Sequence, residues 1–245
     1  MKIGEKDRIF VLTGAGISAE SGIRTFRDSN GLWENHKVEE VASPVGWEAN
    51  PGLVWKFYSE RRQQAALCTP NAAHVALAAF EKRFGDRFFL CTQNVDDLHE
   101  RAGSKRLLHM HGELFVSRCE SWDDPESPYH PVGEGCARRV PFRDDALYFD
   151  VIPRCECGRA IRPHICWFGE IPFEGHRTKR ELRDTTVFVT IGSSGVVYPA
   201  AGFVRASKFV GARTIYVGPE RPANAEEFDE ILLGTATEVV PSLFE

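Results

Sequence analysis

Four cysteines fall within one polar stretch of the 245-residue chain and could bind a metal ion. Cys119, Cys136, Cys155 and Cys157 lie among proline, glycine and charged residues in the segment 114–159. In a reducing compartment a cluster of this kind more often binds metal than forms disulfides. The remaining three cysteines of the chain lie in apolar or helical surroundings, which are typical of reduced and buried thiols.

A second group of residues with chemical potential follows the apolar run RIFVLTG. Gly14, Gly16 and Ala19 fit the pattern G-x-G-x-x-G/A, in which small residues let the backbone approach a pyrophosphate at a helix N-terminus. A tight turn without any ligand would give the same short match. A dehydrogenase would also place an acidic residue after the next strand, but DSNGLWENHKVEE, the region at that spacing, is not a strand. The turn therefore favours a dinucleotide site and argues against hydride transfer.

The elements that must position these residues alternate between apolar strands and amphipathic helices. The predicted strands are 8–14, 87–95, 185–195 and 213–218, and the predicted helices of this part are 71–85 and 198–211. Such alternation predicts an α/β fold with a Rossmann-like parallel sheet that is covered on both faces.

Two stretches interrupt the alternation and predict a smaller inserted domain. Residues 32–68 form a helical module with a helix that starts at Pro51, and residues 114–159 form the cysteine module. The large Rossmann-like, dinucleotide-binding domain would then comprise the three segments 1–31, 69–113 and 160–245.

Composition narrows the possible partners. Hydrophobic residues make up 42% of the chain and charged residues 27%, and no apolar run is long enough to span a bilayer. The formal charge of −5, with dispersed Lys and Arg, argues against nucleic acid and would suit cationic peptides. The N-terminus enters a predicted core strand directly, which leaves no room for a signal or transit peptide ahead of it. We therefore expect a cytoplasmic protein, and one that does not bind membranes. For its oligomeric state we expect a monomer.

Five motifs in order resemble the sirtuin family of NAD-dependent protein-lysine deacylases. They are GAGISAESGIRTFR with GLWE, TQNVDDLHERAG, HMHGEL, RPHICWFGE and GSSGVVYPAAGF, and together they run through nearly the whole chain. The likeness is greatest to the bacterial sirtuins that remove succinyl and malonyl groups.

The resemblance implies a reaction that consumes NAD. The acyl carbonyl oxygen of a modified lysine attacks C1′ of the nicotinamide ribose, nicotinamide leaves, and the ribose hydroxyls complete the transfer to 2′-O-acyl-ADP-ribose. His111 is implied to be the base for a ribose hydroxyl, and a neutral imidazole with an ordinary pKa near ~6.5 suits that role. His109 should face the other side of the extended segment and have a structural role.

The resemblance also implies a set of cofactor residues. Gln93 and Asn94 would orient the ribose, Asp96 would accept from the nicotinamide carboxamide, Phe26 would cover C1′ and Arg27 would pair with phosphate. A helix cap is the alternative explanation for Asn94 and Asp96, and both roles can coexist. The other residues implied to bind the cofactor are Gly14, Ala15, Gly16, Ser18, Gly192, Ser193, Ser194, Glu220 and Ala236.

Tyr58 and Arg61 indicate the acyl group. Three residues apart on a predicted helix, they share a face and could offer a hydroxyl and a guanidinium to a carboxylate. An amphipathic helix with a packed Tyr and a solvated Arg is the alternative. Sirtuins that remove acidic acyl groups carry this Tyr-x-x-Arg pair, with a small residue before it that Ala42 matches. The remaining substrate residues implied by the resemblance are Cys166, Phe168 and Gly169.

The sequence departs from the family in three places, one of which is Cys166 at a position where Val is usual. Many sirtuins hold a structural zinc with two C-x-x-C pairs, but here Trp122 occupies the position of one partner and the second pair is C-x-C. Cys136 could complete a four-cysteine zinc site, His130 is a spare ligand candidate, and a degenerate site without metal is the alternative. Gly218 replaces an Asn that commonly contacts the adenine ribose.

Two rival functions stay open at this point. A mono-ADP-ribosyltransferase could use the same NAD pocket, but Tyr58 and Arg61 would then have no purpose. A catalytically silent NAD-binding scaffold would have no need of a base such as His111.

Overall fold

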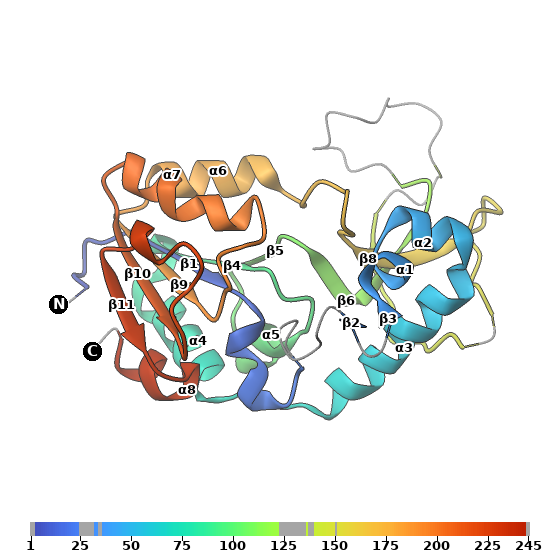
Figure 1. Cartoon of the computed structure of the whole chain (residues 1–245), viewed down its shortest axis with the longest axis horizontal. Coiled ribbons are helices and arrows are strands. Elements are labelled where there is room, and N and C mark those ends of the chain that lie inside the picture. The colour runs from blue at the N-terminus through green and yellow to red at the C-terminus, as the bar shows by residue number, and fades with distance from the viewer. Residues whose placement is uncertain are drawn as a thin grey trace.

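A six-stranded parallel sheet forms the larger part of the molecule (Figure 1). This computed structural model describes residues 3–24, 36–122, 136, 140–149 and 151–243, and the backbone of 32–33. The strand order is β11-β10-β9-β1-β4-β5, and neighbouring strands are parallel throughout. The strands are β1 (Ile9–Thr13), β4 (Phe88–Thr92), β5 (Leu107–His109), β9 (Val187–Ile191), β10 (Arg213–Gly218) and β11 (Glu230–Leu233).

Helices cover both faces of this sheet. Successive side chains of a strand point to opposite faces, so Ile9 and Val11 pack against α4 while Phe10 and Leu12 pack under α6 and α7. Both faces of β1 are buried, which is why its sequence is a continuous apolar run. The covering helices are α4 (Ala72–Phe84) and α8 (Ala236–Val239) on one face, and α6 (Gly175–Arg183) and α7 (Phe203–Phe209) on the other.

The strand order reverses around β1 and so creates a place for a ligand. From β1 the chain proceeds outward through β4 and β5, and after the cysteine module it returns to the other side of β1 as β9, β10 and β11. In an open parallel sheet, ligands bind beyond the carboxyl ends of the strands at such a reversal. The turns after β1, β4 and β9 therefore meet where the sequence predicts the cofactor.

The second part of the molecule combines a helical module with a small antiparallel sheet (Figure 1). In α3, Pro51 occupies the first turn and the Asn50 side chain accepts the Leu53 N–H at 3.0 Å, which caps the helix. The module contains β2 (Leu32–Trp33), β3 (His36–Lys37), α1 (Val38–Val41), α2 (Pro44–Ala49) and α3 (Pro51–Leu67). The small sheet has the order β7-β6-β8 and consists of β6 (Gly112–Cys119), β7 (Phe142–Arg143) and β8 (Ile161–Ile165).

The predicted elements of the large sheet are confirmed, with one helix shorter than expected. Residues 198–211 form a 3₁₀ turn, Ala200–Gly202, and only then the seven-residue α7. Pro199, directly before this turn, has no N–H to donate, so it is compatible with the start of the helical segment but not with its interior. Sequence reasoning did not find α6, β11 or the short α5 (Leu98–Ala102).

The division into two domains stays a prediction. β8 lies within the segment 160–245 that we assigned to the large domain, but it pairs with β6 in the small sheet. A boundary that follows the sheets would therefore fall after Ile165 rather than at residue 160.

No helix in the described part of the chain is long and apolar enough to cross a membrane.

Candidate functional site

Three turns come together at the carboxyl ends of β1, β4 and β9. The Gly14 N–H donates to Ile191 O and the Gly16 N–H to Gly192 O, both at 2.9 Å, and the Gln93 side chain donates to Ser193 Oγ at 3.0 Å. A Cβ on Gly16 would lie 2.7 Å from the Gly192 Cα, so these two turns pack backbone against backbone. Their glycines are therefore required by the contact between the turns as well as by any ligand.

A buried polar network lies beneath these turns. Asn94 Nδ2 donates to Ser18 Oγ and Ser18 Oγ donates to Asp96 Oδ2, each at 3.1 Å. Asp96 Oδ1 also accepts the Leu98 N–H at 3.2 Å, so this carboxylate contacts the first residue of α5, although the N-cap of that helix is Asp97. Burial raises the pKa of Asp96, although the Leu98 and Ser18 hydrogen bonds oppose that shift. Cofactor contact and capping remain compatible at this residue.

Two histidines that sequence reasoning did not single out support the network from below. His74 Nε2 lies 3.4 Å from Ser18 Oγ, and its ring is 4.8 Å from the ring of His99, whose Nε2 lies 3.1 Å from Thr13 Oγ1. Burial lowers the pKa of His74 to about 4 and that of His99 well below its usual range, so both rings are neutral. Asn71, the N-cap of α4, hydrogen-bonds His74 and the Ile17 carbonyl. The sequence signal for this support is the cap pattern Asn71-x-x-His74.

His111 lies on the turn from β5 to β6, beside the end of β4. Its Nδ1 is 3.1 Å from the Gln93 carbonyl oxygen, so Nδ1 carries the proton and Nε2 is left as the basic atom. Burial lowers the pKa of His111, and the Gln93 contact only partly offsets that shift. The ring is therefore neutral at physiological pH, as a proton acceptor must be.

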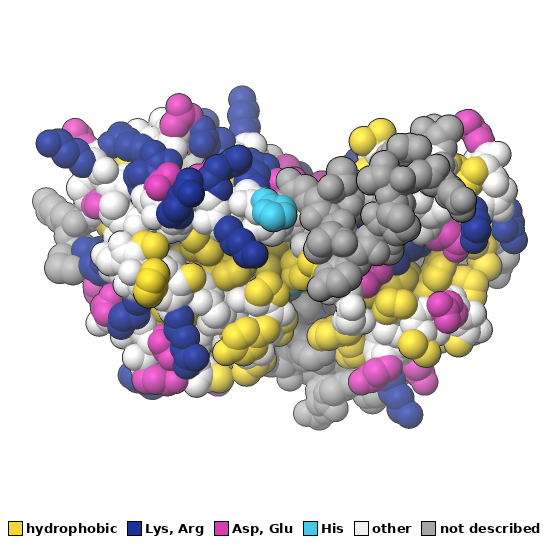
Figure 2. Space-filling view, turned by 90° about the horizontal axis from the view of Figure 1, so that it is seen from above, with side chains coloured by type: hydrophobic (Ala, Val, Ile, Leu, Met, Phe, Trp, Pro, Cys, Tyr) yellow, Lys and Arg dark blue, Asp and Glu magenta, His cyan; other side chains and the backbone are white. Residues whose placement is uncertain are grey.

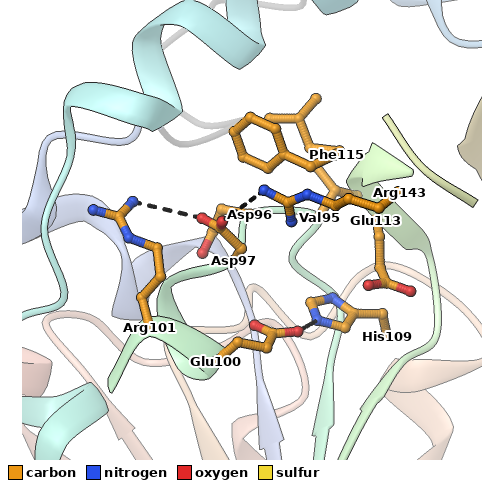
Figure 3. A pocket seen from close by; sticks show the side chains of 10 residues that line it. Val95, Asp96, Asp97, Glu100, Arg101, His109, Glu113, Phe115 and Arg143 are labelled. Atoms are coloured by element: carbon orange, nitrogen blue, oxygen red, sulfur yellow. Dashed lines mark hydrogen bonds and ion pairs between the residues drawn. The ribbon is translucent and has the colours of Figure 1, made fainter. Parts of the chain in front are cut away.

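His109 occupies a different environment, although it is only two residues away. It lines a pocket of about 280 Å³ whose walls come from α5, β6 and β7 (Figure 3). Its Nδ1 is 2.9 Å from the Asn94 carbonyl and its Nε2 is 2.6 Å from Glu100 Oε1. Burial alone would lower the pKa of His109, but the hydrogen bond and charge of Glu100 raise it to about 9. Glu113 and Arg143 complete the charged lining of this pocket.

The residues predicted to select the acyl group lie together around the segment 166–169. Tyr58 is fully buried and accepts the Trp167 indole N–H at 3.1 Å, and the Phe168 N–H donates to the Ala42 carbonyl at 3.0 Å. Arg61, one helical turn after Tyr58, is 9% exposed and acts electrostatically on both Tyr58 and Asp96. The alternative of a solvated Arg61 is therefore wrong.

The backbone of this segment also reaches the candidate base. The Cys166 N–H donates to the His111 carbonyl at 2.9 Å, while burial raises the pKa of its half-buried thiol to about 12. Phe168 and Gly169 are exposed, and Gly169 adopts a positive φ of 93°.

The four cysteines form one cluster that could bind zinc. Their Sγ atoms all lie within 4.8 Å of one another, with Cys136 to Cys155 at 3.1 Å and Cys119 to Cys157 at 3.6 Å, and none of them is in a disulfide. Four thiolates at ~2.3 Å from a tetrahedral ion have sulfur separations in this range. Because all four positions are protein ligands, such an ion would be structural.

Trp122 has a packing role at the place where the family's pattern has a cysteine. Its ring lies 5.1 Å from the Arg118 guanidinium and 5.5 Å from the ring of His164. Cys136 thus supplies the fourth sulfur of the cluster from a more distant part of the chain.

The end of the site near β10 differs from the family pattern for a packing reason. Tyr216 is buried, donates to the Ser193 carbonyl at 3.3 Å, and places its hydroxyl where a side chain at Gly218 would have to lie. Glu220 follows on the surface, and Ala236 is buried at the start of α8. An Asn at position 218 is therefore incompatible with Tyr216 in its present position.

The remaining predicted site residues divide into two groups. Ala15 and Ser194 lie half-buried on the turns after β1 and β9. Phe26, Arg27 and His130 lie outside the described residues. The roles of all the site residues in binding or catalysis stay predictions.

Comparison with known proteins identifies the family of this fold and site. A family model described as the Sir2 family matches residues 14–199, which is more than half of the chain. The chain belongs to the Sir2 family, whose members are also called sirtuins.

Two relatives are similar over nearly their whole length. The NAD-dependent protein deacylase of Pasteurella multocida (strain Pm70) is 50% identical over 236 residues, which cover 96% of this chain and 95% of the relative. The NAD-dependent protein deacylase of Escherichia coli (strain K12) is 45% identical over 243 residues, which cover 98% of this chain and 82% of the relative.

Solved structures give the same result for the fold. A Sir2 homologue in complex with NAD has a TM-score of 0.84 at 37% identity, with 98% of this chain and 89% of that chain covered. A Sir2 protein bound to a myristoylated histone peptide has a TM-score of 0.70 at 30% identity, with 98% and 91% covered.

Proposed function

We propose that this enzyme, an NAD-dependent protein deacylase, removes succinyl and malonyl groups from lysine side chains and retains some deacetylase activity. The observation that carries the acyl preference is the burial of Tyr58 and Arg61 on one turn of α3, where Tyr58 contacts Trp167 of the segment 166–169. A neutral acetyl group cannot form an ion pair with a buried guanidinium, whereas a carboxylate on the acyl group can.

The surroundings of this pair suit a negatively charged ligand. Trp167 donates to the Tyr58 oxygen, and no described residue accepts the hydrogen of the Tyr58 hydroxyl, so that hydrogen can be given to a carboxylate. Arg61 lies 5.8 Å from the Phe57 ring, in surroundings of low dielectric where an opposite charge is attracted more strongly than in water. A hydroxyl and a guanidinium together recognise a carboxylate by geometry as well as by charge.

For the chemical step we assign the base to His111. Its Nδ1 contact with Gln93 O fixes the tautomer that leaves Nε2 free to accept a proton from a ribose hydroxyl. Gln93, Asn94 and Asp96 would orient NAD as a substrate. Acyl-lysine, NAD and one water would give nicotinamide, free lysine and 2′-O-acyl-ADP-ribose. The hydrogen bond from the Cys166 N–H to the His111 carbonyl supports this assignment. It holds the segment 166–169, which we propose contacts the acyl-lysine, next to the base.

The relatives support an acylated protein as the substrate. Those that are 45 to 50% identical are named NAD-dependent protein deacylases, and one Sir2 structure holds a myristoylated histone peptide. We also propose a cytoplasmic location, because all seven cysteines are free, as expected in a reducing compartment.

The test uses two peptides that differ only in the acyl group. Purified protein is incubated with NAD and with succinyl-lysine or acetyl-lysine peptide, and nicotinamide and free lysine peptide are measured by mass spectrometry. We expect a higher kcat/KM for the succinyl peptide. Turnover of the acetyl peptide alone would discard the carboxylate pocket, and nicotinamide release without deacylated peptide would favour ADP-ribosyl transfer.

Substitution of Arg61 separates the pocket from the rest of the enzyme. In Arg61→Met we expect kcat/KM to fall roughly 10- to 100-fold for the succinyl peptide and less than about 3-fold for the acetyl peptide, because a charge-assisted interaction is lost for one substrate only. Lys56→Met, which removes an exposed charge from the same helix, is the matched control and should change neither value. Equal losses on both peptides in Arg61→Met would contradict the acyl preference.

A further inference from the structure

Helix α6 carries a charge opposite to that of the protein as a whole. The chain has a formal charge of −5, whereas the nine residues GHRTKRELR of α6 contain four basic side chains and one acidic side chain. Thr178 and Leu182 are the buried residues of the helix, and Leu182 packs against the large sheet. Lys179, Arg180 and Arg183 are exposed. The helix therefore presents a basic face to solvent.

Two of the four basic side chains of α6 are paired with flanking acids, Arg177 with Glu174 at 2.9 Å and Arg183 with Asp184 at 3.9 Å. Lys179 and Arg180 have no carboxylate within 4.0 Å in the described part of the chain, so these two carry the unpaired charge of the face. Basic side chains in the last turn do complement the helix dipole, which accounts in part for Arg180 and Arg183 but not for Lys179 in the middle of the helix.

Lys and Arg side chains gather on the face that α6 and α7 share (Figure 2). Two of them belong to α7 and are paired, since Arg205 lies 2.6 Å from Glu227 and Lys208 lies 2.9 Å from Asp229. On this face we therefore assign the basic charge that remains available to a partner to Lys179 and Arg180 of α6.

Helix α6 directly follows the segment that we propose contacts the acyl-lysine. Gly175 lies six positions after Gly169, so their Cα atoms are at most about 22 Å apart. The Phe173 N–H donates to the Met110 carbonyl at 3.0 Å, which ties the connection to the residue before His111. Lys179 lies about 6 Å further along the helix axis. An extended peptide of about nine residues covers the whole distance.

We propose that the exposed face of α6 binds an acidic segment of the protein substrate, within about nine residues of the acyl-lysine on one side. This inference rests on the proposed deacylase function and adds a preference among substrates. Charge complementarity carries it, because a local positive face on a negatively charged protein raises the encounter rate with negative segments and repels none of them. It differs from the expectation of cationic peptides, which followed from the net charge alone and stays a prediction.

The experiment compares four acetyl-lysine peptides with the same core and a Gly-Ser spacer. Two carry a tail of four Glu and two a tail of four Gln, and each tail is placed on the N-terminal side in one peptide and on the C-terminal side in the other. Readouts are kcat/KM at 20 and 500 mM NaCl and, without NAD, the Kd by fluorescence anisotropy. For one tail direction we expect the Glu tail to be favoured roughly 5- to 10-fold at low salt through KM, and less than 2-fold at high salt because of screening.

The variants locate the effect on α6. Lys179→Gln/Arg180→Gln should lose the preference for the Glu tail and leave the Gln-tailed peptide unchanged, whereas the matched control Lys82→Gln/Lys105→Gln should keep the preference. A preference that survives in the α6 variant would overturn the proposal. So would tight binding of a DNA duplex that depends on Lys179 and Arg180 without any preference for Glu tails. If no peptide is turned over but anisotropy shows the α6-dependent preference, the deacylase proposal fails and the docking surface stands.

Discussion

His109 and His111 lie two residues apart, yet they occupy opposite sides of the turn between β5 and β6. Both rings are largely buried, and burial lowers the pKa of each. His109 contacts the Glu100 carboxylate, which raises its pKa to about 9, whereas His111 has only the Gln93 carbonyl, which leaves its pKa below the usual value. One ring is therefore a charged structural group and the other a neutral base.

The difference teaches that burial by itself does not determine the protonation state of a histidine. Desolvation acts on both rings in the same direction, and the sign of the net shift is set by whether a carboxylate lies within hydrogen-bonding distance. Figure 3 shows Glu100 beside His109 in the pocket, and His111 is not among the residues that line this pocket. The two sides can therefore be separated by substitution.

The largest expected difference is between His111→Gln and His109→Gln. Without a base, His111→Gln should lower kcat for deacylation by at least ~10²-fold with little change in stability. His109→Gln should keep kcat within about 3-fold but lower the free energy of unfolding by about 1–3 kcal/mol, because Glu100 loses its charged partner. Steady-state kinetics and urea unfolding of both variants check this. A loss of catalysis in His109→Gln with intact stability would break the comparison.

A smaller effect is expected in the pH dependence of stability. The pKa of His109 is about 9 in the fold and near ~6.5 in the unfolded chain, so the folded protein binds the additional proton. Its stabilisation is fully present below pH ~6.5 and is lost as the pH rises toward 9. We expect a contribution of about 1–2 kcal/mol after screening at the half-exposed Glu100.

Urea unfolding at pH 6.5 and pH 9 measures this contribution. The decline should be smaller in His109→Gln than in the parent protein, and the difference between the two proteins isolates His109 from other groups that titrate in the same window. An identical decline in both would show that the Glu100 contact does not hold the proton.

The smallest effect concerns the acid limb of the activity profile. Because burial lowers the pKa of His111, the midpoint of the limb in kcat/KM for NAD should lie below pH 6.5. His109→Gln should leave that midpoint in place, since the pKa of His111 is set by burial and by Gln93. A midpoint at pH 7 or above, or one that moves in His109→Gln, would mean that the two histidines titrate together.

The regular half of the fold could be predicted from the sequence because its strands are buried on both faces. β1, β4, β9 and β10 consist of apolar or β-branched residues that end at small residues or polar turns, and all four lie where the apolar runs predict them. The small sheet gives no such signal. β8 contains Arg162 and His164, both of them buried, and it pairs with a strand about 45 residues earlier. Local periodicity cannot reveal pairing over that separation.

The site shows the same division. The resemblance named Tyr58 and Arg61 as a pair, but the Trp167 indole that fixes the Tyr58 hydroxyl comes from a segment 109 residues away. Gly218 looked like the loss of a cofactor contact, and only the packing of Tyr216 gives the reason for the change. The four cysteines were named from composition, while their convergence on one centre depends on the small sheet.

The sequence by itself determined the parallel sheet, the glycine turn that predicts a dinucleotide, the family and the residue types of the site. These features are local, because strand burial, turn conformation and motif spacing act over a few residues. The tertiary structure alone decided which histidine is charged and that Arg61 is buried. Each of these depends on which distant groups share a low-dielectric environment, and folding is what brings them together.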